Sequence, residues 1–340
     1  MKKICVLLAC LFSVFILICG ANLAQASNKQ LNLKCQNSLP DKYVASKALK
    51  RFAEQVEKKT NGRIEITVFS TGQLFKDTDL PTALPSGAVD LALPNLGQWA
   101  GIAPSLAAMS LVGPYESAEH FYRLQEGKIG KLWDDDLQKR ANTKVLSYMS
   151  LGSTDIITSP NKFIKSLDDF KGLKMQCATK GMQIFAEALG AVPTSISASD
   201  IYIALQRGTV DAAGSSVVSV LNRKWYEVSK YQTRVIMNPE GPFALLINLD
   251  VWKDISGDDQ KILVECANEA WLWNRGKVKE ATQEAWNKIK NEKNVQVYEF
   301  PVNTWKEWAK KIESSTRKYM EKTAGKKDAD TIFKMIDEAR

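Results

Sequence analysis

The sequence is poor in the residues that most often carry catalysis and metal binding. It contains one histidine, His120, and no pair of cysteines at the spacing of a zinc site, so a zinc centre lacks its ligands and a serine or cysteine triad lacks an obvious base. The phosphate-binding pattern Gly-x-x-x-x-Gly-Lys is also missing, and with it the commonest nucleotide loop. The sequence therefore predicts no enzyme, no metal site and no cofactor.

Long hydrophobic runs are missing everywhere except at the N-terminus. Lys2 and Lys3 precede the apolar stretch 4–19, and Ala24-Gln25-Ala26 has small residues at both positions that a cleavage site needs. This is the pattern of a signal peptide, so we expect residues 1–26 to direct export to the periplasm and then to be removed. An uncleaved membrane anchor is the alternative, because the run is long enough to cross a thin bilayer.

Cysteine becomes scarce once residues 1–26 are set aside. Of the six cysteines in the sequence, Cys35, Cys177 and Cys266 remain, in a compartment that favours oxidation. Three cysteines cannot all pair with one another. Because each of them lies in an apolar strand-like or helix-like segment, we expect buried free thiols.

A strong excess of one charge is also missing. The formal net charge is +8, and the densest basic stretches, 306–311 and 322–327, lie among Glu, Trp and Tyr in helical patterns. A solvated helix face explains such stretches better than a nucleic-acid surface, which would need supporting context. No nucleic-acid partner is expected.

What the chain does contain is a regular alternation of strand and helix patterns. Strand-like segments at 31–35, 64–69 and 89–93 alternate with helical ones, of which 41–59 has apolar residues at every fourth position. Such alternation predicts a parallel α/β layer. After Gly152 the strand pattern starts again, which predicts a second lobe.

The predicted fold is therefore α/β with two lobes, each a mixed sheet flanked by helices. We expect the first lobe to comprise residues 27–152 and 242–255, and the second to comprise 153–241 and 295–340. Residues 256–294 should form one long helix that spans both lobes. Capping-box spacings at Ser166–Asp169, Ser197–Asp200 and Ser256–Asp259 predict three helix starts.

Two stretches in the second lobe have a helix-to-strand transition that is typical of a ligand crevice. In Gly172-Leu-Lys-Met-Gln-Cys177 a glycine ends a short helix before a strand, and in Tyr202-Ile-Ala-Leu-Gln-Arg-Gly-Thr-Val-Asp211 Gly208 stops a helix before another. Strand ends in such layers converge on a crevice where a ligand can lie.

The sequence resembles a known family in these two stretches and in three others that follow the family's order. The three are Gly87-Ala-Val-Asp-Leu91, Leu189-Gly-Ala-Val-Pro193 and Tyr226-Glu-Val-Ser-Lys-Tyr231. The family consists of the DctP-type solute-binding proteins of the tripartite ATP-independent periplasmic (TRAP) transporters. The resemblance implies a type II-like, two-lobed periplasmic-binding-protein fold. It also implies a monomer that closes on a small organic solute and delivers it to the TRAP membrane permease subunits for uptake driven by an ion gradient.

The chain departs from the family pattern where relatives hold a carboxylate. Gln176 stands where the family usually has an arginine, Thr154 or Asp155 stands at the place of a second arginine, and Ala212-Ala213-Gly214 replaces the usual Gly-x-Glu. A carboxylate buried without a cationic partner is costly. The departures therefore favour a solute other than a simple dicarboxylate.

Two interpretations of these departures stay open. The solute is neutral, zwitterionic, cationic or aromatic, with Asp155 or Glu116 as a counter-charge, or it is an acid that another cation reaches, for which Lys180 and Arg207 are candidates. Ten candidate ligand-binding residues follow from the expected strand ends: Asn37, Asn95, Trp99, Tyr115, Thr154, Asp155, Gln176, Gly214, Ser215 and Phe243. Core packing for the three aromatic residues, and turn formation for the two asparagines, are the alternatives.

The function predicted from the sequence is solute capture for a TRAP transporter. A receptor of the same fold that presents its ligand to a membrane sensor is the first alternative, and an exported enzyme is the second, although the acid-base groups that an enzyme needs are missing.

Overall fold

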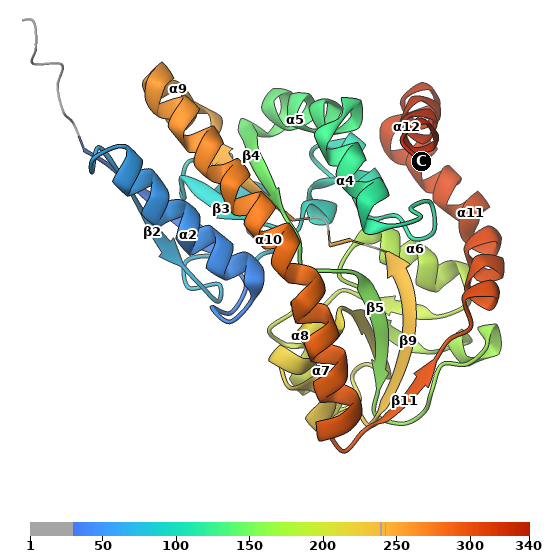
Figure 1. Ribbon diagram of the computed structural model, residues 1–340. Coiled ribbons are helices and arrows are strands. Elements are labelled where there is room, and N and C mark those ends of the chain that lie inside the picture. The colour runs from blue at the N-terminus through green and yellow to red at the C-terminus, as the bar shows by residue number, and fades with distance from the viewer. Residues whose placement is uncertain (1–29, 239, 242) are drawn as a thin grey trace, which may run out of the picture.

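The computed structural model describes residues 30–238, 240–241 and 243–340. It has two sheets joined by a helix that runs the length of the molecule (Figure 1). The predicted signal peptide, residues 1–26, lies outside the described residues. Within the described residues, no helix combines the length and the apolar character needed to cross a membrane.

The first lobe is built on a five-stranded sheet whose strands are ordered β2-β1-β3-β10-β4. β1 pairs in parallel with β2 and β3, whereas β10 is antiparallel to β3 and β4. The strands are β1 Leu31–Asn37, β2 Ile64–Phe69, β3 Leu91–Leu93, β4 Thr143–Met149 and β10 Phe243–Asn248. The helices of this lobe are α2 Val44–Lys59, α3 Leu80–Ala83, η1 Leu96–Trp99, η2 Pro104–Ser110, α4 Ala118–Glu126, α5 Lys128–Ala141 and α9 Leu249–Asp254.

The second lobe is built on a six-stranded sheet with the order β11-β9-β5-β8-β6-β7. Here β5 is antiparallel to both of its neighbours, β8 and β9. The strands are β5 Thr154–Ser159, β6 Lys174–Gln176, β7 Val192–Thr194, β8 Ala212–Ser215, β9 Tyr231–Asn238 and β11 Gln296–Glu299. The helices are η3 Leu167–Phe170, α6 Lys180–Ala188, α7 Ile201–Gln206, α8 Val217–Asn222 and η4 Trp225–Glu227.

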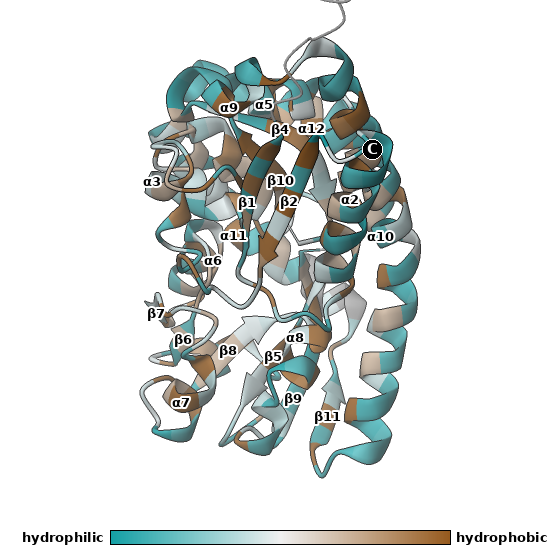
Figure 2. Cartoon of the chain, turned by 90° about the vertical axis from the view of Figure 1, so that its left-hand side faces the viewer, coloured by the Kyte–Doolittle hydropathy of each residue, from teal (hydrophilic) through white to brown (hydrophobic). Residues whose placement is uncertain are grey.

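The chain crosses between the sheets where β4 leads into β5 and where β9 leads into β10. The chain thus enters the second sheet as β5 and returns to the first sheet as β10. Each of these two entering strands is antiparallel to its neighbours in the sheet. Because the remaining strands run in parallel, their carboxyl ends point toward the same crossing region. Figure 2 shows hydrophobic residues along β1, β2 and β10 and a largely hydrophilic outer surface on the helices.

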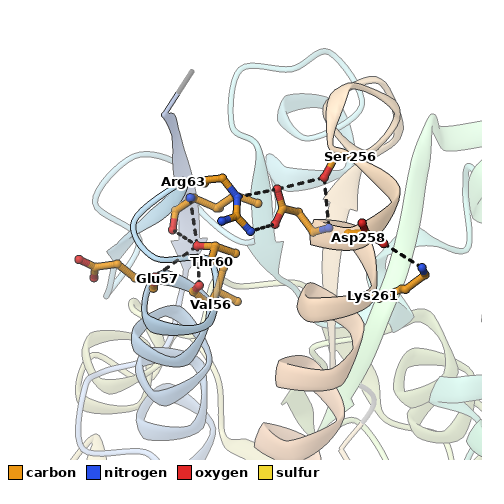
Figure 3. A network of polar contacts seen from close by, with 9 residues as sticks. Val56, Glu57, Thr60, Arg63, Ser256, Asp258 and Lys261 are labelled. Atoms are coloured by element: carbon orange, nitrogen blue, oxygen red, sulfur yellow. Dashed lines mark hydrogen bonds and ion pairs between the residues drawn. The ribbon is translucent and has the colours of Figure 1, made fainter. Parts of the chain in front are cut away.

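The long helix α10, Gly257–Glu292, spans both lobes and has 36 residues. Ser256 caps its first turn by accepting a hydrogen bond from the Asp259 backbone. The Asp259 carboxylate is held by the Arg63 guanidinium, with Nη2 at 2.6 Å and Nε at 3.3 Å from its two oxygens (Figure 3). The two-pronged pair fixes the start of α10 against the first lobe. It also lowers the pKa of Asp259.

The C-terminal segment divides between the lobes. β11 joins the second sheet and α11, Val302–Ala324, follows it, whereas α12, Lys326–Glu338, packs with α4 and α5 in the first lobe (Figure 1). His120 on α4 contributes to this docking, because its Nε2 lies 2.9 Å from the Ile336 carbonyl oxygen and its Nδ1 accepts from the Glu116 backbone. We expected all of 295–340 in the second lobe; an amphipathic pattern shows that one face is buried but not which surface covers it.

One local expectation differs from the structure. Asp200, not Ser197, is the residue before α7, and its side chain caps nothing. Lys224, between α8 and η4, has a left-handed backbone with φ of 60°. Cys35, Cys177 and Cys266 are buried free thiols, as predicted.

Candidate functional site

A cavity of about 250 Å³ lies between the lobes, at the carboxyl ends of the parallel strands. Ser38 follows β1, Thr71 follows β2 and Asn95 follows β3, while Ala178, Ser195 and Ser216 follow β6, β7 and β8. The lining therefore comes from both sheets and is rich in hydroxyl and amide groups. Such an enclosed site, with a few convergent polar groups, is the usual form of a small-molecule pocket.

Six of the ten residues predicted from strand ends line this cavity. They are Asn95, Thr154, Gln176, Gly214, Ser215 and Phe243. Asn95 and Phe243 also form an isolated antiparallel bridge, so β3 and the start of β10 meet at the cavity wall. Contact of these six with a ligand stays a prediction.

The Gln176 side chain is buried at the cavity wall with its carbonyl oxygen unpaired. Its Nε2 donates to the Ile196 carbonyl at 3.3 Å, but its Oε1 has no partner among the described residues. A buried polar atom without a partner costs free energy. A solute that donates a hydrogen bond to Oε1 would remove this cost.

Methionine side chains form the floor of the cavity around Gly214. A Cβ atom at Gly214 would lie 2.6 Å from the Met182 methyl, 3.0 Å from the Met175 methyl and 3.3 Å from the Met237 methyl. Met182 and Met237 also line the cavity. Since methionine side chains are flexible, this floor can adjust to the shape of a solute.

The remaining four predicted residues lie outside the cavity lining. Asn37 donates to Ser46 Oγ at 2.9 Å and accepts from the Leu39 backbone, and Trp99 and Tyr115 belong to the first-lobe core. The Tyr115 hydroxyl donates to the Ala108 carbonyl. Strand-end position therefore did not identify cavity residues in these two cases: Trp99 is the last residue of η1, Tyr115 lies in the segment after η2, and both rings pack into the core.

Asp155 is buried between the second sheet and the long helix, away from the cavity. Its carboxylate accepts from the Val217 backbone at 2.9 Å and from the Trp286 indole at 2.8 Å. Burial raises the pKa of Asp155 to about 6 despite these donors. Asp155 thus connects β5 to α8 and α10, and its role here is structural.

The other charged candidates also lie elsewhere. Glu116 is exposed and pairs with Arg340 at 3.5 Å, and Arg207 is an exposed residue at the end of α7. Lys180 lines a second cavity of about 450 Å³ beside the first, where its Nζ donates to Gln183. Charged residues that the sequence analysis missed stand in the lining instead: Lys76, Asp77 and Arg223.

Three contacts between the lobes close the mouth of the cavity. The Tyr43 hydroxyl donates to Ser219 Oγ at 3.2 Å, Ser197 Oγ lies 3.5 Å from Asp77 Oδ1, and Lys76 Nζ lies 4.0 Å from Asp200. Asp77 also accepts from Gln98 at 3.2 Å. The two lobes therefore meet across the mouth of the cavity, in a closed arrangement.

A buried carboxyl group joins the two crossing segments behind the cavity. Glu240 accepts from the Tyr122 hydroxyl at 2.6 Å, from the Gly241 backbone at 2.9 Å and from the Ser150 hydroxyl. Ser150 is bonded in turn to Asn274 on α10, at 2.6 Å through its backbone nitrogen. Burial raises the pKa of Glu240. The network connects both crossings to the long helix.

Two sheets joined by crossing strands, with a closed cavity at their facing strand ends, define a two-lobed solute-binding protein. The chain belongs to the bacterial extracellular solute-binding protein family 7, the DctP family, whose model matches residues 36–323. The resemblance to TRAP transporter receptors is thereby confirmed.

Curated relatives and solved structures agree with this assignment. The C4-dicarboxylate-binding periplasmic protein DctP of Rhodobacter capsulatus is 28% identical over 264 residues, 77% of this chain and 78% of the relative. A TRAP periplasmic solute-binding protein of Chromohalobacter salexigens, solved with D-glucuronate, has a TM-score of 0.82 and 25% identity, and covers 91% of this chain and 100% of its own. The sugar acid binding protein DctPAm of Advenella mimigardefordensis, solved with galactonate, has a TM-score of 0.83 and 22% identity over 92% of this chain and 99% of its own.

Proposed function

We propose that this protein captures a small organic solute in the periplasm and delivers it to the membrane permease of a TRAP transporter, for uptake driven by an ion gradient. The observation that carries the proposal is the cavity of about 250 Å³ at the strand ends of both lobes, with contacts that close its mouth. Residues 1–26 provide the export signal that this location requires.

The cavity favours a hydroxylated solute over a simple dicarboxylate. Serine, threonine, asparagine and glutamine side chains dominate the polar lining, and Gln176 has an oxygen that awaits a donor. Two carboxylates would need two available cations, but Lys76 already has Asp200 and Asp77 close by. The relatives with bound glucuronate and galactonate support the same class of solute.

Binding without catalysis fits the lining. Asp77 is the carboxylate among the described lining residues, and the one histidine, His120, is in the core of the first lobe. General acid-base catalysis needs groups within hydrogen-bond reach of the reacting atoms.

The proposal is tested by mass spectrometry of solute retained by the purified protein, followed by thermal shift. The panel is D-glucuronate, galactonate, succinate, D-glucose, an amino acid and an aromatic acid. We expect a hydroxylated compound to raise the melting temperature in proportion to log concentration, as a ligand of the native state must. The proposal fails if no solute is retained and no member of the panel, at millimolar concentration, shifts the transition. Delivery is tested separately, by uptake into vesicles that contain the permease, with and without the loaded protein.

A further inference from the structure

Arg223 brings a cation to the cavity without a carboxylate partner. It follows the last turn of α8, is partly buried, and belongs to the cavity lining. Its guanidinium lies 6.0 Å from the ring centroid of Tyr43, across the mouth between the lobes. Within the described residues, no Asp or Glu lies at ion-pair distance from it, so its charge is left uncompensated at the cavity.

The other two charged groups of the lining each have partners of their own. Lys76 lies 4.0 Å from Asp200, and its side chain is 63% exposed. Asp77 is engaged by Gln98 and Ser197. The described lining therefore contains one carboxylate, Asp77, and two cations, Lys76 and Arg223. Of the two cations, Arg223 is the one without a carboxylate at ion-pair distance among the described residues.

The surroundings of Arg223 are positive. The pKa of Lys42 is lowered by partial burial and by repulsion from Lys224 and Arg223. Lys224 has Glu227 at 3.8 Å as a partner. Ser219 and Ser216, one turn and two turns before Arg223 along α8, also line the cavity. Because Ser216 Oγ donates its proton to Ser219 Oγ at 3.0 Å, an anion at this point would find two kinds of donor on one element, the Arg223 guanidinium and the Ser219 hydroxyl.

We infer that Arg223 holds the anionic group of the solute and makes the site selective for compounds with a single acidic group. The inference rests on the proposed function. The guanidinium provides two parallel donors, which suit a carboxylate, and its place at the mouth lets it act in the closed state of the lobes. The hydroxyl and amide groups deeper in the cavity then take the uncharged part of the solute.

The test compares Arg223→Gln with Arg207→Gln, an identical substitution at an exposed arginine of the same lobe outside the cavity lining. Isothermal titration measures binding of D-glucuronate, galactonate and D-glucose, and Arg223→Lys tests partial rescue. We expect Arg223→Gln to weaken the binding of the acids by about 10- to 100-fold, the range of a charged hydrogen bond. Arg207→Gln should stay within about twofold of the unmodified protein, because a distant exposed charge is screened.

The readouts separate this inference from the proposed function. If Arg223 acted only through the packing of α8, its replacement would weaken acidic and neutral solutes equally, and that result overturns the inference. An unchanged affinity for the acids in Arg223→Gln, or a neutral solute retained by the unmodified protein, overturns it while the proposed function stands. If the unmodified protein binds no solute at all, both fail.

Discussion

The hydroxyl of Tyr43, at the start of α2 in the first lobe, donates a hydrogen bond of 3.2 Å to Ser219 on α8 in the second. This contact forms only when the lobes meet, and Tyr43 itself is outside the cavity lining. Tyr43→Phe should therefore weaken solute binding by about 2- to 10-fold, the value of one neutral hydrogen bond, by lowering the population of the closed state. Tyr202→Phe, which removes a hydroxyl contact to Glu227 within one lobe, is the control. Equal affinities of the two variants in calorimetry would contradict the prediction.

Gln176→Leu should separate solute binding from stability. Removing the amide leaves the Ile196 carbonyl without its donor but also removes the unsatisfied Oε1, so the free energy of unfolding should change by less than about 1 kcal/mol. Solute affinity should fall about 2- to 10-fold if Oε1 accepts from the solute. Gln232→Leu is the matched control. Like Gln176, Gln232 is a buried glutamine with a bonded Nε2 and an unsatisfied Oε1, but it lies outside the cavity lining. Equal losses of affinity in both variants would argue that Gln176 only supports the sheet.

Gly181→Ala should drive the lobes apart. A Cβ atom at Gly181, in the first turn of α6, would lie 2.1 Å from the Ser110 carbonyl oxygen on η2 of the first lobe. Backbone cannot yield as a flexible side chain does, so we expect a loss of about 1–3 kcal/mol and weaker solute binding. Gly276→Ala on α10 meets no atom within 4 Å and should be neutral or stabilising, because alanine favours helices. Small-angle scattering should show a more open Gly181→Ala protein; an unchanged profile and affinity would refute the close approach.

Asp155 should make stability depend on pH in a direction opposite to that of an ordinary carboxylate. Its pKa is raised from 3.8 to about 6 by burial, so between these values the folded state binds more protons than the unfolded state. The free energy of unfolding should therefore fall as pH rises from about 4 to about 6, by at most about 3 kcal/mol, and stay level above that.

The titration of Asp155 can be followed directly at its partner. The Trp286 indole donates to the Asp155 carboxylate at 2.8 Å, so its proton resonance should shift with an inflection near pH 6. Asp155→Asn should abolish that inflection and remove the part of the fall in stability that Asp155 contributes in this window, while Glu240, whose pKa is also raised by burial, keeps its own contribution. A Trp286 resonance that does not change between pH 4 and pH 7 would show that the carboxyl group does not titrate there.

Local patterns predicted the elements of this fold because each depends on a few neighbouring residues. Gly208 ends α7 with φ of 68°, and Ser256 with Asp259 starts α10 as a capping pair. The place of α12 depended on a partner surface some 200 residues away, through His120 and Ile336. No periodicity contains that information.

In the site, too, features set by neighbouring residues were predictable, and those set by distant parts of the chain were not. Strand-end positions gave Gln176 and Gly214, since the carboxyl ends of parallel strands must converge. They did not give Arg223, which reaches the cavity from the far end of α8 and looks in the sequence like an ordinary basic residue after a helix. A tryptophan after a strand, such as Trp99, can point into either the cavity or the core, and only the turn into η1 decides it.

The 36-residue helix α10 adds a third connection to the two crossing strands, and it is stiff. At about 1.5 Å per residue it is about 54 Å long, anchored at one end by Arg63 and toward the other by Asp155. Because the Arg63 pair holds α10 to the first lobe and the bond between Trp286 and Asp155 holds it to the second, separation of the lobes would have to bend α10 or break one of these two contacts. A bent helix resists further bending, so α10 would oppose opening.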